Sequence, residues 1–171
     1  RLFSEGTFNA AFVPSYSSVL DNKKKSQYFA NSIFNLLIIG LFFLVLVIEI
    51  LMPLFVFLIA PGFEGDYQKM ELAVTLTQIT FPFLMFISLA SFFSAILNSN
   101  NKFAIASAAP IILNILLIGV LLFGKILNDQ LVYYLSYAVT LAGILQLVFL
   151  YFYVKKYFSP KINFSIRIDS K

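Results

Sequence analysis

The sequence contains no cysteine and no histidine. Without them the chain has no disulfide, no thiolate nucleophile, no Ser-His-Asp triad and none of the commonest transition-metal ligands. Charge is also scarce, because only 12% of the 171 residues are Asp, Glu, Lys or Arg, whereas 60% are hydrophobic and the mean hydropathy is +0.90. This composition is too apolar for a soluble domain and indicates an integral membrane protein.

Long apolar runs divide the chain into helices that cross a membrane. A crossing needs about 20 apolar residues, and four runs are long enough, at residues 29–60, 74–97, 104–123 and 131–154. The run at residues 7–20 is shorter, so we interpret it as the second half of a spanning helix. The predicted fold is all-α: a polytopic transmembrane helical bundle of four full spans plus the second half of a preceding broken span. A basic tail or linker at residues 155–171 follows.

Prolines mark the places where these helices are expected to kink or break, since proline lacks the N–H that a helix interior needs. Pro14 lies in the first run, Pro53 late in the second, Pro82 in the third and Pro110 in the fourth. Small residues around Pro82 and Pro110 favour close helix packing. Pro110 needs no substrate to explain it, whereas the small residues of the span that contains Pro82 suit plain packing and the lining of a pathway equally.

The basic residues are concentrated in two of the five segments outside the spans. Residues 21–27 hold three lysines, the segment after the last span holds five Lys or Arg, and each of the three connections between them holds one. An even number of crossings separates the two clusters, so both lie on one side, which the positive-inside rule assigns to the cytoplasm. Such clusters suit anionic lipid headgroups better than nucleic acid.

The first fourteen residues, RLFSEGTFNAAFVP, combine charge with a helix breaker. Arg1 and Glu5 lie close to Gly6, which permits a break in helical geometry. A helix broken at membrane depth is tolerated only where it is buried in protein or lines a watery cavity. Glu5 therefore has two interpretations: it lines such a cavity, or it only favours the positive end of the helix that follows.

Glu49 is a second acid of interest, because it is the one ionisable residue in the run 29–60. An acid inside a span is costly and is a functional candidate by default. The plainer interpretation is that Glu49 lies towards the far half of the membrane, about 24 Å along the helix axis from a crossing that begins near Ile33. There it is protonated or faces a neighbouring helix.

RLFSEGTFNAAFVP resembles the signature at the second transmembrane helix of the MurJ (MviN) lipid II flippases. APGF at 60–63, the stretch 79–114 and PKINF at 160–164 resemble later blocks of that family in the same order. The resemblance covers nearly the whole chain. It implies a fold similar to that of the multidrug and oligosaccharidyl-lipid exporters, with two helical lobes around a central cavity, and it implies that this chain is part of the N-terminal lobe.

The resemblance also implies a transporter, not an enzyme, with no cofactor and no metal. Its substrate would be lipid II, an undecaprenyl-pyrophosphate-linked disaccharide-pentapeptide, carried by alternating access from the cytoplasmic to the periplasmic leaflet of the inner membrane for peptidoglycan and cell-wall biogenesis. Arginines bind the pyrophosphate in family cavities. Arg1 matches the second member of a family basic pair whose first member is missing here, and Glu5 matches a family acidic position, so the resemblance assigns both to the cavity. The implied partners are lipid II, membrane lipids and the remainder of the transporter, with no nucleic acid.

Other functions fit parts of this pattern. A related exporter of another lipid-linked glycan or of drugs would share the helix count and orientation. A membrane-embedded enzyme that acts on polyprenyl phosphates would need clustered acids for Mg²⁺, or a His or Cys, whereas the eight acids here are scattered. A purely structural helical module would not account for the family blocks.

Overall fold

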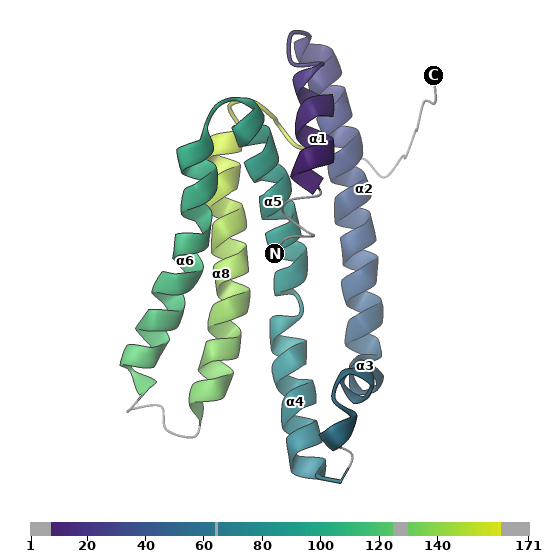
Figure 1. The fold of residues 1–171 in the computed structure, drawn as a ribbon, viewed down its shortest axis with the longest axis vertical. Helices are drawn as coiled ribbons and strands as arrows, with labels where there is room; N and C mark the ends of the chain where they lie inside the picture. The colour runs from purple at the N-terminus through teal and green to yellow at the C-terminus, as the bar shows by residue number, and fades with distance from the viewer. Residues whose placement is uncertain (1–7, 64, 125–129, 162–171) are drawn as a thin grey trace.

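The computed structural model describes residues 8–63, 65–124 and 130–161. Within them every regular element is a helix: α1 (Phe8–Ser17), α2 (Lys23–Ile50), α3 (Met52–Ile59), the short 3-10 helix η2 (Pro61–Phe63), α4 (Tyr67–Thr80), α5 (Phe83–Ser99), α6 (Phe103–Leu122) and α8 (Leu131–Val154). Figure 1 shows the long helices running up and down in alternation, with α6 and α8 paired on one side and α1 beside α2 on the other. Four helical segments of the described residues are long and apolar enough to cross a membrane. The predicted all-α transmembrane bundle is confirmed.

Helix α2 begins at Lys23, earlier than the predicted start at residue 29. Asn22 explains this start, because its side-chain oxygen accepts a hydrogen bond of 3.2 Å from the backbone N–H of Lys25 and so caps the helix. At 28 residues, α2 is about 42 Å long, which exceeds the hydrocarbon thickness of about 30 Å. The lysine-bearing first turns therefore extend beyond the apolar layer.

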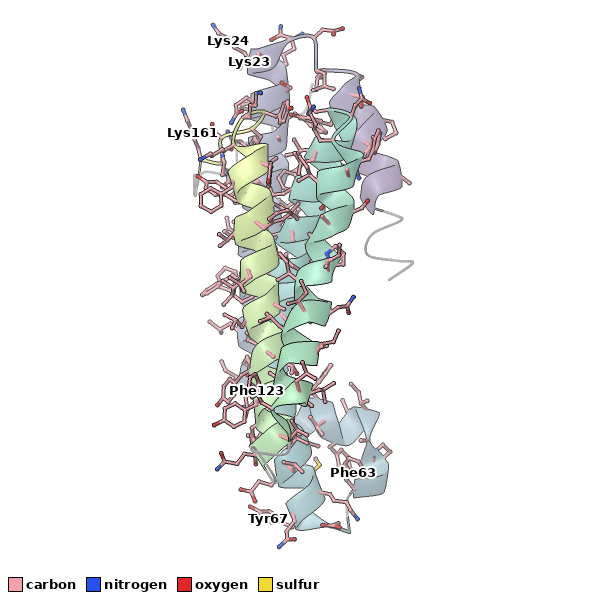
Figure 2. All side chains as sticks on the ribbon, turned by 90° about the vertical axis from the view of Figure 1, so that its left-hand side faces the viewer. Lys23, Lys24, Phe63, Tyr67, Phe123 and Lys161 are labelled. Carbon is pink, nitrogen blue, oxygen red and sulfur yellow. The ribbon has the colours of Figure 1, made fainter. Side chains whose placement is uncertain are left out.

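The two ends of the bundle differ in the residues they carry. Figure 2 places Lys23, Lys24 and Lys161 at one end, which we call the basic end, and Phe63 and Tyr67 at the opposite end. This arrangement agrees with the predicted even number of crossings between the two basic segments.

The opposite end carries the acidic connection before α4. The carboxylate of Asp66 accepts a hydrogen bond of 3.1 Å from the backbone N–H of Lys69 and lies 2.8 Å from the Lys69 ammonium. The hydrogen bond from the Lys69 side chain lowers the pKa of Asp66 below its usual value. Asp66 therefore keeps its charge and caps α4.

Helix α5 is the centre of the bundle, because it packs against α1, α2, α6 and α8. Its contact with α8 is tight at Gly143, where an added Cβ would lie 2.7 Å from Cδ2 of Phe83 and 3.1 Å from Cβ of Phe86. Lipid tails are as apolar as the helices, so association depends on packing instead of a hydrophobic driving force. Gly143 thus leaves room on α8 for the Phe83 side chain of α5.

A cluster of aromatic rings joins separate elements near the basic end. Phe158, which follows α8 and is 1% exposed, lies with its ring centroid 5.8 Å from that of Phe92 and 6.1 Å from that of Phe34. Phe12 of α1 packs edge-on against Phe92 at 5.2 Å. The rings therefore hold α1, α2 and α5 together with the chain that leaves α8.

The segment after α8, residues 155–161, is also bonded along one face of α2. Gln27, Asn31 and Asn35 are four residues apart, so they share that face. The side chain of Gln27 bonds the backbone N–H and C=O of Ser159, and the Asn35 side chain donates to the carbonyl of Lys161 at 3.2 Å. This part of the predicted basic tail or linker is fixed to the bundle by polar side chains of α2.

Candidate functional site

The predicted cavity residues Arg1 and Glu5, together with the predicted helix break at Gly6, lie outside the described residues. The described chain starts with α1, which packs against α5 and α2. Phe12 and Tyr16 of α1 are buried in the shared core. The segment that directly follows the predicted cavity residues is therefore seated on the central helix.

The four predicted kink residues divide into two kinds. α2 ends at Ile50 and α3 begins at Met52 with Pro53 in its first turn, and Figure 1 shows the chain turning sharply there. α4 ends at Thr80, and Pro82 directly precedes α5. Pro14 and Pro110, by contrast, lie inside continuous helices, α1 and α6.

Pro110 borders a pocket of about 180 Å³ between α5, α6 and α8. Three small residues, Ala90, Ala106 and Ala109, form part of its wall. Its polar lining consists of serine hydroxyls and carboxamides only: Ser91, Ser94 and Asn98 of α5, Ser107 of α6, and Gln146 of α8. No charged side chain contributes to this lining, so the pocket is polar but electrically neutral.

Gln146 is the residue that makes this pocket unusual. It is 1% exposed, and neither its Nε2 nor its Oε1 has a hydrogen-bond partner. A buried amide without partners costs roughly 1–3 kcal/mol in proteins, and buried polar groups are normally paired. Gln146 is therefore a polar group that is buried against a cavity and still lacks its partner.

The pocket serines differ from the other hydroxyls of the bundle. Elsewhere in the described helices a serine or threonine hydroxyl commonly donates to a carbonyl three or four residues earlier in its own helix, as at Ser32, Thr75, Ser88 and Ser99. This local bond is the usual way for such a side chain to be satisfied in a helix. Ser91, Ser94 and Ser107 line the pocket instead.

Pro110 adds an acceptor to the same place. Because proline has no N–H, the carbonyl four residues earlier, that of Ala106, lacks its usual helical donor. Ala106 and Pro110 both line the pocket. The sequence explains the local geometry of α6, since small residues precede the proline and leave room beside it.

Glu49 lies apart from this pocket, near the end of α2. It is partly buried, and its Oε1 has no hydrogen-bond partner. The described part of the chain contains one ion pair, Lys69 with Asp66, so no base neutralises Glu49 there. The described residues also hold no group of three or more acids that could bind a metal ion.

Sequence reasoning missed Gln146, although a signal was present. Gln146 stands alone among apolar neighbours in TLAGILQLVFLY, and a polar residue inside a span is a candidate for interhelical bonding or function. The charged residues at 1–5 and the prolines are the stronger signals in the sequence. Only the packed structure brings Gln146, from α8, next to the serines of α5 and α6.

Alternating spans and a basic end define a polytopic helical membrane protein. Comparison with known proteins gives the family. The family model described as "Lipid II flippase MurJ" matches residues 1–170, and the chain belongs to the MurJ family.

Individual relatives agree with the family match. The chain is 39% identical over 158 residues to the probable lipid II flippase MurJ of Rickettsia prowazekii, which covers 91% of this chain and 31% of the relative. It is 40% identical over 161 residues to the Rhizobium tropici protein of the same name, an alignment that covers 91% of this chain and 30% of the relative. The lipid II flippase MurJ of Burkholderia cenocepacia is 33% identical over 148 residues, an alignment that covers 85% of this chain and 29% of the relative. The chain thus spans about a third of the length of these relatives, which are named as flippases and not as enzymes.

Proposed function

We propose that this chain forms part of a flippase that moves lipid II from the cytoplasmic to the periplasmic leaflet of the bacterial inner membrane. The observation that carries the proposal is the MurJ match over residues 1–170. It is supported by the four spanning segments and by the gathering of Lys23, Lys24 and Lys161 at one end.

The chemistry of the substrate explains why such a protein is needed. A pyrophosphate-linked disaccharide-pentapeptide is polar and charged, and charged groups are expensive to place in the hydrocarbon core. A transporter offers a polar route between two helical units that rock against each other around a central site. In this proposal the chain supplies helices of one unit, and its basic end faces the cytoplasm.

Glu5 and Arg1 are the residues we assign to the central cavity. Arg1 would pair with the pyrophosphate, since arginine matches phosphate oxygens in a bidentate manner. Glu5 would orient an arginine or take part in coupling. The support for this assignment is the sequence context of both residues at a predicted helix break, which a membrane tolerates only in protein or beside a cavity.

The test uses a hybrid flippase: the Burkholderia cenocepacia relative with its matching segment replaced by residues 1–171. Cells depleted of their own flippase are supplied with the hybrid, with Glu5→Gln, or with the matched control Glu71→Gln on the exposed side of α4. Glu5→Gln is expected to abolish growth at normal membrane abundance, whereas Glu71→Gln supports it. Normal growth of the Glu5→Gln cells at normal abundance would return Glu5 to a helix-capping role.

An exporter of another lipid-linked glycan or of drugs is the second candidate. It would use the same helical architecture, and the neutral pocket would suit many polar solutes. The relatives named as lipid II flippases favour the first candidate. Growth of depleted cells on the hybrid would separate the two, because an exporter of another cargo cannot supply peptidoglycan precursor.

A further inference from the structure

Asn114 is a polar side chain on the outer surface of a spanning helix. It is exposed, and its carboxamide forms no hydrogen bond within the part of the chain that the structure describes. Helix α6 has 20 residues, so it is about 30 Å long, which matches the hydrocarbon thickness of a bilayer. Asn114 lies about 16 Å from the start of α6. Its short side chain is therefore near the middle of the membrane and cannot reach either surface.

Asn114 belongs to a stripe of exposed residues along α6. Residues three and four apart share one face of a helix, and the stripe consists of Ile111, Asn114, Ile115, Ile118 and Leu121. Each of its four aliphatic members is at least 55% exposed. Figure 1 shows α6 as the outermost helix on its side of the bundle. The described helices therefore leave this outer stripe of α6 largely uncovered.

The Asn114 carboxamide decides what can cover the outer stripe of α6. It has two N–H donors and an oxygen that accepts, and lipid tails offer neither an acceptor nor a donor. Burial of such a group without a partner is costly. Water would satisfy the carboxamide, but it would leave the four aliphatic side chains unburied. A suitable cover is apolar along its length and presents one polar group at the depth of Asn114.

A second spanning helix meets these conditions. A segment that crosses hydrocarbon satisfies its own backbone hydrogen bonds only as a helix or a closed barrel. Asparagine, glutamine, serine and threonine side chains form hydrogen bonds between such helices. The chain covers 31% and 30% of the Rickettsia prowazekii and Rhizobium tropici relatives, so most of each relative lies outside the match. A helix of the same polypeptide also loses less freedom on docking than a separate copy of the protein would.

We propose that the outer stripe of α6 is the docking surface for a spanning helix of the complete protein from outside residues 1–171. Asn114 forms a hydrogen bond with a hydroxyl or carboxamide side chain of that helix, and the four aliphatic residues pack against its apolar length. The inference uses the length of the relatives, but it does not depend on which cargo the protein moves.

Photocrosslinking in the hybrid flippase identifies what covers the stripe. The photoreactive residue p-benzoylphenylalanine replaces Ile115, which is 63% exposed beside Asn114. The same replacement of Leu116 is the matched control, because position 116 shares a helix face with Ala109, which borders the pocket between α5, α6 and α8. After illumination in native membranes, the linked peptides are identified by mass spectrometry.

Position 115 is expected to link to a peptide of the same hybrid molecule from outside residues 1–171, whereas position 116 should link within them. A link from position 115 to lipid only, to a second copy, to a peptide within residues 1–171, or to nothing would overturn the proposal. Should the variant at position 115 fail to accumulate, Ile111 in the same stripe serves as the crosslinking position.

Asn114→Leu in the hybrid tests the hydrogen bond through the sign of its effect on thermal stability. If Asn114 bonds to a docked helix, leucine leaves the polar partner unpaired, and the Tm should fall by about 1–3 °C. If Asn114 faces lipid, leucine removes an unsatisfied amide and the Tm should rise. Ile118→Leu is the control, because it changes the same stripe without changing a polar group, and it should leave the Tm nearly unchanged.

An Asn114→Leu hybrid with the same Tm as the Ile118→Leu control, or with a higher one, would overturn the assignment of a hydrogen bond to Asn114. Neither measurement requires transport. A hybrid that shows the expected crosslink and the lower Tm but does not restore growth would retain the docking surface and contradict only the flippase proposal.

Discussion

The backbone N–H of Lys161 donates a hydrogen bond of 2.9 Å to Oδ1 of Asn31. Residue 31 lies in the third turn of α2, whereas residue 161 lies beyond the end of α8. The bond therefore joins the first long span to the segment that follows the last one.

Asn31→Leu is expected to loosen the segment after α8. Leucine has nearly the shape of asparagine but accepts no hydrogen bond, so the change removes roughly 0.5–1.5 kcal/mol of attachment. Amide hydrogen exchange at Ser159 and Lys161 should accelerate accordingly. Ser32→Ala is the control, because the Ser32 hydroxyl bonds to Tyr28 of its own helix. Unchanged exchange at Lys161 in Asn31→Leu would show that the contact is not formed in the membrane.

Gly143→Ala is expected to destabilise the bundle. The added methyl group would meet the Phe83 ring and Cβ of Phe86, and overpacking of this kind typically costs about 1–3 kcal/mol. Gly119→Ala is the matched control, since nothing lies within 4 Å of a Cβ at Gly119 and alanine favours a helix by up to about 1 kcal/mol. Unfolding by denaturing detergent measures both changes. A Gly143→Ala protein as stable as the Gly119→Ala protein would contradict the close α5–α8 contact.

Gln146→Leu is expected to stabilise the protein. The substitution replaces an unpartnered amide with an apolar group of similar size, so the free energy of unfolding should rise by about 1 kcal/mol. Gln68→Leu, on the exposed first turn of α4, should change it by less than about 0.5 kcal/mol. A loss of stability in Gln146→Leu would mean that the amide has a partner in the native protein.

The orientation of the bundle can be read from single cysteines in the hybrid flippase, with any cysteine of the relative replaced. Positions 24 and 161 lie at the basic end, and Asp66 lies next to Tyr67 at the opposite end. A membrane-impermeant thiol reagent added to spheroplasts should label Asp66→Cys and spare Lys24→Cys and Lys161→Cys, and lysis should make all three reactive. Labelling of position 24 before lysis would invert the assignment.

Much of this fold could be predicted from the sequence, because apolar length alone dictates where a chain crosses a membrane. The span at 131–154 coincides with α8, and the turn between the predicted spans 74–97 and 104–123 connects α5 to α6. In that turn Asn101 has a φ of 58°, a left-handed conformation that asparagine tolerates better than most residues.

The parts that could not be predicted depend on one local helix cap and on contacts between distant segments. The start of α2 at Lys23 depends on the cap at Asn22, which outweighs the unfavourable placement of lysines at the positive end of a helix. The pocket at Gln146 depends on three helices meeting, and the binding of residues 159–161 to α2 depends on side chains more than 120 residues away. Hydrophobic periodicity carries no information on such pairings.

The measurement that tests the flippase proposal most directly is the appearance of lipid II on the outer leaflet. Cells depleted of their own flippase are supplied with the hybrid that carries residues 1–171, and lipid II is assayed with a reagent that reaches only the periplasmic face. The hybrid is expected to restore outward lipid II and growth, while the same hybrid with Glu5→Gln restores neither at equal membrane abundance. A hybrid that accumulates normally in the membrane and leaves lipid II on the cytoplasmic leaflet would contradict the proposal.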